Sequence, residues 1–219
     1  MAKEFYSDKH KFILNPNERI KKAKKIAAVI MDFYGNDLNN LSCLDIGCSG
    51  GIITDYLAQY FKKVVGIDVD KNAIKFAIKD FRRKNLSFKV QDTAKLRFSD
   101  CSFDVVVCNH IYQYIKDKKN LLNEIHRVLK PNGFCYFAAT TRFSHREMAF
   151  LSQNYLTYFG LRRLAKDFKI VDYSITVLKK DEDFYMRSVI SGLLKKIPNI
   201  VMKITLPFFP SYIWILKKE

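Results

Sequence analysis

Acidic side chains are scarce in this sequence. Asp and Glu number 22 against 38 Lys and Arg, which gives a formal net charge of +16 over 219 residues, and residues 184–218 contain no acid at all. An excess of positive charge attracts anionic partners at long range, such as nucleic acid, a membrane surface or a phosphorylated substrate. The alternative is a lysine-rich surface that serves only solubility.

Several structural signals are also missing. The five cysteines are odd in number and form no Cys-x-x-Cys pair or zinc-spaced arrangement with histidine, so we expect neither a disulfide framework nor a metal site. Residues 1–11 are polar and charged, so we expect no cleaved signal peptide and a cytoplasmic location. With 48% hydrophobic residues, the length suits one domain over residues 1–219.

The most informative stretch is Leu44-Asp45-Ile46-Gly47-Cys48-Ser49-Gly50-Gly51. An apolar strand stops there at glycines, and a helical pattern follows. Glycine tolerates positive φ and lets a ligand approach the backbone, while the helix start supplies unpaired N–H groups. We therefore expect this turn to seat a ligand.

The dinucleotide fingerprint Gly-x-Gly-x-x-Gly fails at this turn, because Ser49 and Ile52 occupy its second and third glycine positions. A pyrophosphate would also be unfavourable beside Asp45, whose carboxylate suits a ligand that carries a cation. A second strand ends in Asp68, 21 residues after Gly47. Nucleotide-binding folds place a carboxylate near this offset against ribose hydroxyls. The two acids together indicate an adenosine-containing ligand.

Hydrophobic spacing predicts strands alternating with helices. The expected strands are 41–46, 63–68, 86–91, 102–109, 134–139, 170–178 and 211–216. Helices are expected over 17–34, 52–57 and 156–168, and two more are indicated by apolar faces that span 74–81 and 121–129. This alternation predicts an α/β fold with a doubly wound, mostly parallel sheet of seven strands, whose ligand lies at the carboxyl ends of the strands.

The ordered motifs between residues 41 and 139 resemble those of the class I S-adenosylmethionine-dependent methyltransferases, and of their type 11 branch in particular. The glycine turn is similar to motif I, with Ser49 at the middle glycine. Residues 102–104 and 124–133 resemble the pair of motifs that flank strand four and strand five in that branch, with Asn132 replacing a glycine. The resemblance implies a Rossmann-like methyltransferase fold, an antiparallel last strand and S-adenosylmethionine as cofactor.

The resemblance also implies a set of site residues. Asp68 would bind the ribose, and Asp92 with Thr93 would hold the adenine, although Asp92 alone could equally cap a turn. The implied cofactor-binding residues are Asp45, Gly47, Cys48, Ser49, Gly51, Asp68, Val69, Asp92, Thr93 and Asn109. The resemblance divides the chain into a helical segment (1–40), a cofactor-binding core (41–140) and a substrate-side half (141–219).

A general base is needed if the acceptor is a hydroxyl group. His110 and His145 are the candidate catalytic residues, with Tyr112 and Tyr114 as further candidates and a purely structural histidine as the alternative. No metal is expected to take part.

An insertion of about thirty residues, 181–210, precedes the last expected strand, where 2–5 residues are usual for a hairpin. It is apolar and basic, a composition typical of interfacial membrane contacts, while a helical cap over the site or a dimer contact is the alternative. Pro198, Lys203, Pro207 and Pro210 interrupt the run and argue against a membrane span.

The expected function is methyl transfer to a small-molecule acceptor, for which the insertion favours a lipid, a quinone or a lipid-linked sugar. An anionic membrane surface is a further expected partner, so peripheral membrane attachment is the alternative to a purely cytoplasmic location. The alternatives in function are an RNA methyltransferase, which the net charge favours, and an S-adenosylmethionine-binding protein without turnover. No RNA-binding module is recognisable in the sequence.

Overall fold

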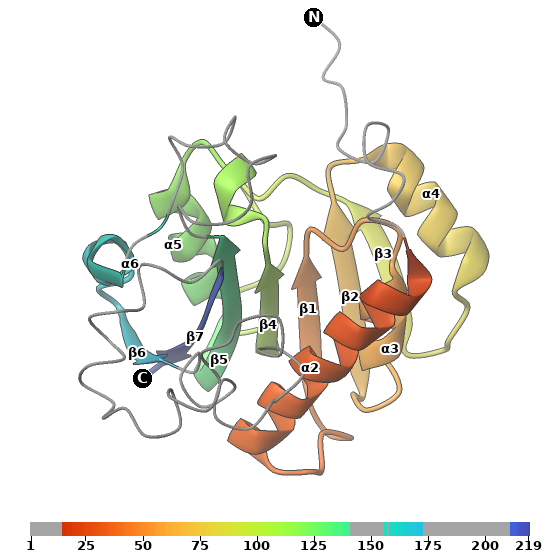
Figure 1. Ribbon diagram of the computed structural model, residues 1–219, viewed down its shortest axis with the longest axis horizontal. Coiled ribbons are helices and arrows are strands. Elements are labelled where there is room, and N and C mark those ends of the chain that lie inside the picture. Colours follow the sequence, from red (N-terminus) through yellow and green to blue (C-terminus); the bar gives the residue numbers. More distant parts are fainter. Residues whose placement is uncertain (1–14, 141–155, 157, 173–210) are drawn as a thin grey trace, which may run out of the picture.

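The computed structural model describes residues 15–140, 156, 158–172 and 211–219. Within these ranges one seven-stranded sheet has the order β3-β2-β1-β4-β5-β7-β6 (Figure 1). Its strands are β1 (Ser42–Ile46), β2 (Lys63–Asp68), β3 (Leu86–Val90), β4 (Phe103–Asn109), β5 (Leu129–Thr140), β6 (Phe168–Asp172) and β7 (Ser211–Lys218). The α/β sheet expected from the sequence is confirmed.

Most strand pairs are parallel. β1 pairs with β2 and β4, β2 with β3, and β4 with β5, all in parallel, whereas β7 runs antiparallel to both β5 and β6. Ile46 lies opposite Ile67 on one side and Cys108 on the other. The carboxyl ends of β1, β2 and β4 therefore meet at one edge of the sheet.

Helices cover both faces of the sheet (Figure 1). They are α2 (Pro16–Tyr34), α3 (Ile52–Leu57), α4 (Lys71–Asp80), α5 (Lys118–Val128) and α6 (Tyr158–Leu164), with a short 3-10 turn η2 (Tyr112–Tyr114) after β4. One hydrophobic core joins α2 and α3 to the sheet, and a second joins α5 and α6 to the opposite face. Alternation along each strand supplies both cores, since Cys43 belongs to the first and Leu44 to the second.

Capping residues extend two helices beyond their apolar patterns. Asp70 accepts hydrogen bonds from the N–H groups of Asn72 and Ala73, and Asp117 accepts one from that of Asn120. Both helices therefore begin three residues before the first apolar position of their patterns, Ile74 and Leu121. β5 also begins earlier than predicted, at Leu129, because that residue pairs with Phe103 before a register shift.

In the described ranges no helix is long and apolar enough to cross a bilayer. The insertion 181–210 and His145 lie outside the described residues, as does most of the strand expected at 170–178. The helix expected at 156–168 is shorter, from Tyr158 to Leu164.

Asp104 joins three parts of the sheet at the amino ends of its strands. Its Oδ2 accepts hydrogen bonds from the backbone N–H and the hydroxyl of Ser42, at 2.8 and 2.7 Å, and from Lys130 Nζ at 2.8 Å. Burial opposes ionisation of Asp104, but the hydrogen bonds from Lys130 and Ser42 outweigh it and lower its pKa below the ordinary value. One carboxylate thus ties β1, β4 and β5 together.

We predict that Asp104→Asn lowers the free energy of unfolding by about 1–3 kcal/mol, because it removes the charge from three hydrogen bonds. Urea denaturation measures this. Asp80→Asn, at an exposed position at the end of α4, is the control and should change the value by less than about 0.5 kcal/mol. Equal effects of the two substitutions would contradict the role given to Asp104.

Candidate functional site

The turn after β1 packs too closely for side chains. Gly47 has φ +77°, and a Cβ at this position would collide with Ile111 Cγ2. Gly51 has φ +83°, and its Cβ would come within 2.8 Å of the Phe88 ring. Ser49, where the resemblance led us to expect a glycine, has φ +50°, so it adopts the left-handed conformation at some cost in strain.

The N–H groups of this turn point into the protein. Those of Gly47 and Cys48 donate to the carbonyl of Ile67 at 2.8 and 3.0 Å, and that of Ser49 donates to Asp68 Oδ2 at 2.9 Å. The sequence places the ligand-facing N–H groups at the start of the following helix, α3 (Ile52–Leu57), and that expectation stays a prediction, because these three residues precede the helix. Their own N–H groups are paired with β2, as a buried backbone requires. An anionic pyrophosphate would therefore find few donors here.

Asp45 is buried beneath the same turn, with 3% of its surface exposed. Its Oδ2 accepts a hydrogen bond from the Thr54 hydroxyl at 2.7 Å. Desolvation raises the pKa of Asp45 to about 6, against the opposing effects of Thr54 and of the positive charge of Arg19. A buried carboxylate of this kind is stabilised in its charged form by a cation that binds next to it.

Asp68 stands at the end of β2 beside the turn. While its Oδ2 accepts from Ser49, its Oδ1 accepts from the N–H of Asp70 at 3.0 Å. A carboxylate has about four lone-pair positions, so Asp68 retains capacity to accept from hydroxyl groups of a ligand. Its negative charge also contributes to the raised pKa of Asp45, so the two carboxylates lie close enough to interact.

An open cavity of about 790 Å³ lies beyond β2 and β3. It is lined by Val69, Val90, Gln91, Asp92, Ala94, Lys95 and Arg97. The two valines are unusually exposed for apolar side chains, at 48% and 44%. Apolar walls with a nearby carboxylate suit a flat, partly polar ring.

Asp92 begins the segment that forms one wall of this cavity. Its Oδ1 accepts a hydrogen bond from the N–H of Ala94 at 3.0 Å, so it does cap a turn, as the alternative reading of this residue proposed. The other carboxylate oxygen is available for a ligand in the same geometry. The neighbouring Thr93 is buried, with 9% exposure.

Asn109 and His110, two of the predicted site residues, lie at the carboxyl end of β4, on the same edge of the sheet as Asp45 and Asp68. Asn109 ends β4, and His110 follows with φ +56° and donates its backbone N–H to the carbonyl of Ala138 at 2.8 Å. Desolvation, and then the positive charges of Lys22 and Arg19, lower the pKa of His110 to about 4. The imidazole is therefore neutral near pH 7 and able to accept a proton, though only as a weak base.

Tyr112 is not available as a base. It is buried at 3% exposure, packs edge-on against Phe137, and desolvation raises its pKa to about 12. Tyr114 is 42% exposed. Among the described residues, no group of three or more His, Cys, Asp and Glu could hold a metal ion.

Sequence reasoning missed three residues of this edge. The positive charges of Arg19 and Lys22, near the start of α2, act on His110. Gln113 is buried at 6% exposure, and its Nε2 donates to the His110 carbonyl at 2.9 Å. Gln113 Oε1 has no hydrogen-bond partner within the described part of the chain. Only helical periodicity could have hinted at the placement of Arg19.

Comparisons with known proteins point to one family. Residues 44–137 match a protein family described as a methyltransferase domain. An uncharacterised methyltransferase of Schizosaccharomyces pombe is 32% identical over 110 residues, covering 46% of this chain and 39% of that protein. A ubiquinone biosynthesis O-methyltransferase of Idiomarina loihiensis is 28% identical over 134 residues, which cover 58% of this chain and 55% of that protein. The chain thus spans roughly half the length of these relatives.

A solved structure supports the fold. Phosphoethanolamine N-methyltransferase 2 of Haemonchus contortus, in complex with S-adenosyl-L-methionine, superposes with a TM-score of 0.63 at 20% identity. The match covers 89% of this chain and 52% of that one. At this identity the likeness concerns the arrangement of the strands and helices.

The burial of Asp45 predicts a specific pH dependence of stability. Because the pKa of Asp45 rises from 3.8 unfolded to about 6 folded, the folded chain binds its proton more tightly, and stability falls as the pH rises through this window. Asp45→Asn removes this effect. We expect the unfolding free energy of the original chain, minus that of the variant, to fall by about 2 kcal/mol between about pH 4.5 and pH 7.

Urea denaturation of both chains across this range provides the measurement. Other titrating groups are common to the two chains, so the difference reports on residue 45. A difference that does not change with pH would show that Asp45 ionises as easily in the folded chain as in the unfolded one.

Proposed function

The chain belongs to the type 11 branch of the class I S-adenosylmethionine-dependent methyltransferases, and on this premise we propose that it transfers a methyl group from S-adenosylmethionine to a small, lipid-like acceptor. The observation that carries the proposal is the turn after β1. It combines a closely packed glycine backbone, inward-facing N–H groups and the buried carboxylate of Asp45. This combination suits a cationic ligand better than a phosphate.

The chain's own residues fit the parts of this cofactor. Asp45 would compensate the positive charge of the ligand's amino acid portion, and Arg19, whose charge reaches Asp45, would attract its carboxylate. Asp68 would accept hydrogen bonds from the ribose hydroxyls. Val69 and Asp92, in the wall of the cavity, would contact the adenine. Gly47, Cys48, Ser49, Gly51, Thr93 and Asn109 would complete this site.

Catalysis would consist mainly of alignment. S-adenosylmethionine supplies an already activated methyl group, so the protein's task is to hold the acceptor in line and to exclude water. The side chain of Ile111 packs directly against the backbone of Gly47 and so covers this part of the turn. His110, neutral near pH 7 because of its lowered pKa, would take a proton from a hydroxyl acceptor, and His145 is the second candidate for this role.

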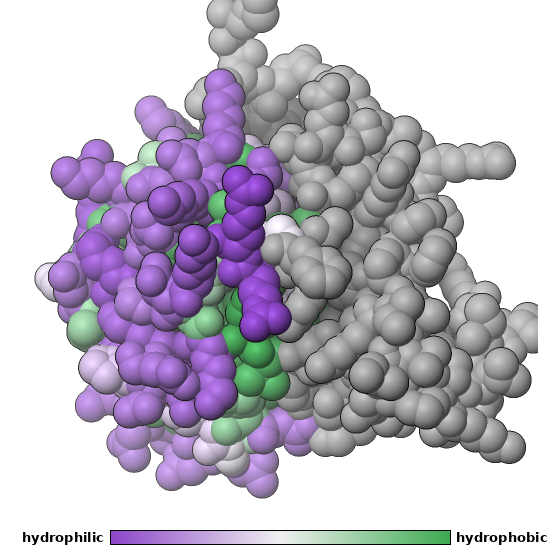
Figure 2. All heavy atoms as spheres, turned by 90° about the vertical axis from the view of Figure 1, so that its left-hand side faces the viewer, coloured by the Kyte–Doolittle hydropathy of each residue, from purple (hydrophilic) through white to green (hydrophobic). Residues whose placement is uncertain are grey.

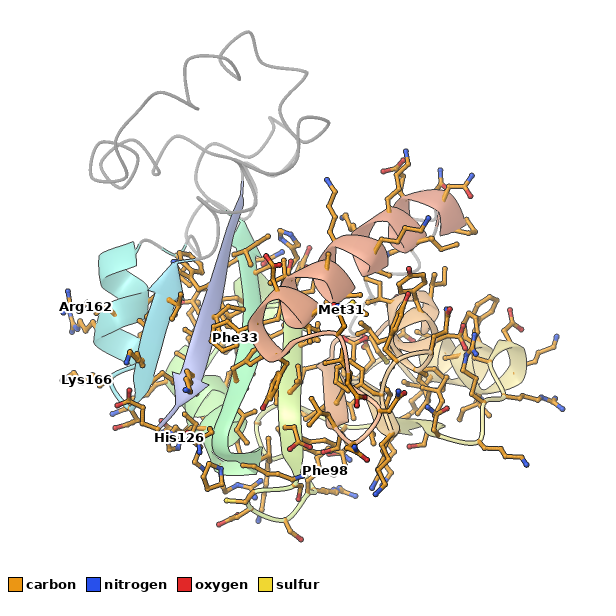
Figure 3. All side chains as sticks on the ribbon, turned by 90° about the horizontal axis from the view of Figure 1, so that it is seen from below. Met31, Phe33, Phe98, His126, Arg162 and Lys166 are labelled. Carbon is orange, nitrogen blue, oxygen red and sulfur yellow. The ribbon has the colours of Figure 1, made fainter. Side chains whose placement is uncertain are left out.

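The lipid-like acceptor rests on charge and composition. The insertion 181–210 is apolar and basic, and residues 184–218 contain no acid. In the described part of the chain, Arg162 and Arg163 of α6 and Lys166, just after that helix, are exposed, and Arg162 and Lys166 point away from the sheet (Figure 3). Figure 2 looks onto the side that bears α6, where hydrophilic side chains predominate. Exposed basic side chains in the described part, together with the apolar and basic sequence of residues 181–210, favour contact with an anionic membrane that presents the acceptor.

Cofactor binding should depend on pH through Asp45. Since the cation of the ligand needs the ionised carboxylate, we predict that affinity for S-adenosylmethionine at about pH 5 is roughly tenfold lower than at pH 7.5, with a plateau above about pH 7. Titration calorimetry measures this. In Asp45→Asn the affinity should be low and nearly independent of pH, and in Asp68→Asn it should be low but keep the pH dependence. Unchanged affinity in both variants would remove the assignment.

The acceptor can be tested with labelled S-adenosylmethionine. We predict that label enters the lipid fraction of a cell extract when this is presented in anionic vesicles. Replacing Lys195, Lys196 and Lys203 with Gln should lower the rate at limiting vesicle concentration by about a hundredfold, since each basic residue near an anionic surface contributes about 1 kcal/mol. A vesicle of neutral lipids is the control. Label only in the RNA fraction would favour the RNA methyltransferase instead, and binding without any transfer would favour a protein without turnover.

A further inference from the structure

A polar stripe runs along α5. Asn120, Glu124 and Arg127 are spaced four and three residues apart, so they lie on one face of the helix. This face looks toward the segment 91–102, which connects β3 to β4 and carries Asp92 and Thr93. The stripe contacts the backbone of that segment at successive points.

The first contact is made by Asn120. Its Nδ2 donates to the carbonyl of Ala94 at 2.6 Å. The N–H of the same residue, Ala94, donates to Asp92 Oδ1 at 3.0 Å. Asn120 and the carboxylate of Asp92 are therefore linked through a single residue, and a shift of Ala94 would turn the carboxylate.

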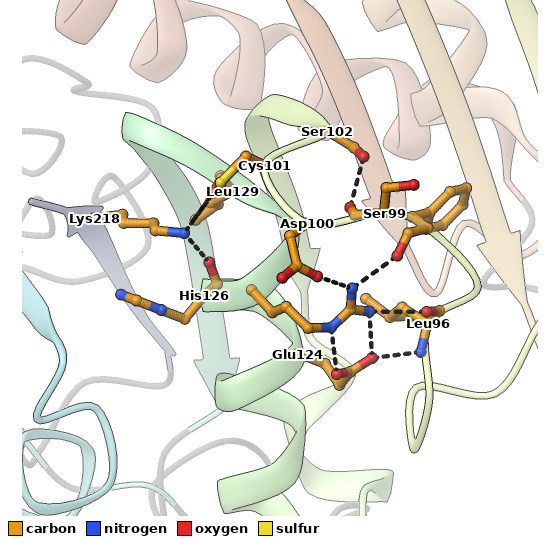
Figure 4. A network of polar contacts seen from close by, with 11 residues as sticks. Leu96, Ser99, Asp100, Cys101, Ser102, Glu124, His126, Leu129 and Lys218 are labelled. Carbon is orange, nitrogen blue, oxygen red and sulfur yellow. Dashed lines mark hydrogen bonds and ion pairs between the residues drawn. The ribbon is translucent and has the colours of Figure 1, made fainter.

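The second and third contacts hold the middle of the segment (Figure 4). The N–H of Leu96 donates to Glu124 Oε2 at 2.7 Å, and Arg127 Nη2 donates to the carbonyl of Leu96 at 2.9 Å. Arg127 Nη1 donates to the carbonyl of Phe98 and to Asp100, both at 2.8 Å. Both ends of the Leu96 residue are thus fixed by charged side chains, which form the stronger kind of hydrogen bond.

The two charged residues of the stripe, Glu124 and Arg127, also contact each other. Arg127 donates from Nε to Glu124 Oε1 and from Nη2 to Glu124 Oε2, both at 2.8 Å, in a two-point contact. Such forked pairs restrict the geometry of both partners. Leu96 is buried at 2% exposure, so the segment has an apolar anchor at the same place.

The segment also forms one wall of the cavity beyond β2 and β3. Asp92, Ala94, Lys95 and Arg97 all line it. The N–H of Arg97 donates back to Gln91 Oε1 at 2.9 Å, which closes the segment into a compact loop. The stripe on α5 therefore holds a wall of the cavity, although its own three side chains do not line that cavity.

We propose that Asn120, supported by Glu124 and Arg127, positions Asp92 to accept a hydrogen bond from the exocyclic amine of the cofactor's adenine. Asn120 is thus a positioning residue, acting through Ala94, and it touches no part of the ligand. This inference rests on the proposed function. It adds that recognition of the base depends on a helix whose side chains lie outside the site.

The test compares two ligands on the full chain. S-adenosylhomocysteine carries the amine, whereas S-inosylhomocysteine has a carbonyl oxygen in its place and cannot donate to Asp92. We expect the original chain to prefer the first by about tenfold in calorimetric affinity, the size of one charge-assisted hydrogen bond. In Asn120→Ala we expect this preference to fall to about two- to threefold, mainly through weaker binding of S-adenosylhomocysteine. Asn123→Ala, an exposed position on the same helix, is the matched control and should keep the full preference.

A second variant guards against a general loss of structure. Glu124→Gln keeps an acceptor for the Leu96 N–H but loses the charge opposite Arg127, so its preference should lie between those of the original chain and Asn120→Ala. A purely structural role predicts equal losses for both ligands in either variant, and that result would overturn the inference. A full preference in Asn120→Ala would overturn it as well.

The original chain separates this inference from the proposed function. If it binds neither ligand, the proposed function itself fails. If it binds both ligands equally, the proposed function stands, but the contact between Asp92 and the amine is refuted.

Discussion

The close approach of the backbone after β1 to its neighbours is the constraint on which the site depends. A methyl group on Gly47 would have no room beside Ile111. The N–H groups of Gly47 and Cys48 donate to the carbonyl of Ile67, near the end of β2. Parallel pairing of β1 with β2 and β4 brings these groups to one edge of the sheet. The N–H groups of Gly47, Cys48 and Ser49 are paired with Ile67 and Asp68 of β2, and the carboxylates of Asp45 and Asp68 give this edge its negative charge.

Electrostatics at this edge follow from burial. Asp45 loses its hydration beneath the turn, so its pKa rises, while the positive charge of Arg19 favours the ionised carboxylate and makes the rise smaller. The same positive charges add to the effect of desolvation on His110 and keep it neutral. A site that holds a buried acid and a neutral histidine beside cationic side chains can receive a ligand that carries both charges. The net charge of the chain, in contrast, concerns association with larger anionic partners.

The family motifs of the sequence divide into two kinds in the structure. The glycine turn and Asp68 lie where the ligand is expected, and they display positive φ values and interacting carboxylates. Asp104 with Lys130, and Glu124 with Arg127, lie away from this edge and hold strands or loops together through charge-assisted hydrogen bonds. A recognisable motif is thus not by itself evidence of ligand contact, since part of the signature maintains the frame that positions the rest.

The sequence by itself determined the strands and helices, their alternation and the glycine turn, because hydrophobic periodicity and the conformational freedom of glycine act over a few neighbouring residues. It also indicated Asp45 and Asp68 from their places at strand ends. Only the tertiary structure decided that the turn's N–H groups face inward, that Arg19 acts on the site, and that Asn120 reaches Asp92 through Ala94. These are contacts between residues far apart in the chain, and local patterns contain no information on which distant groups the packing of helices on a sheet will bring together.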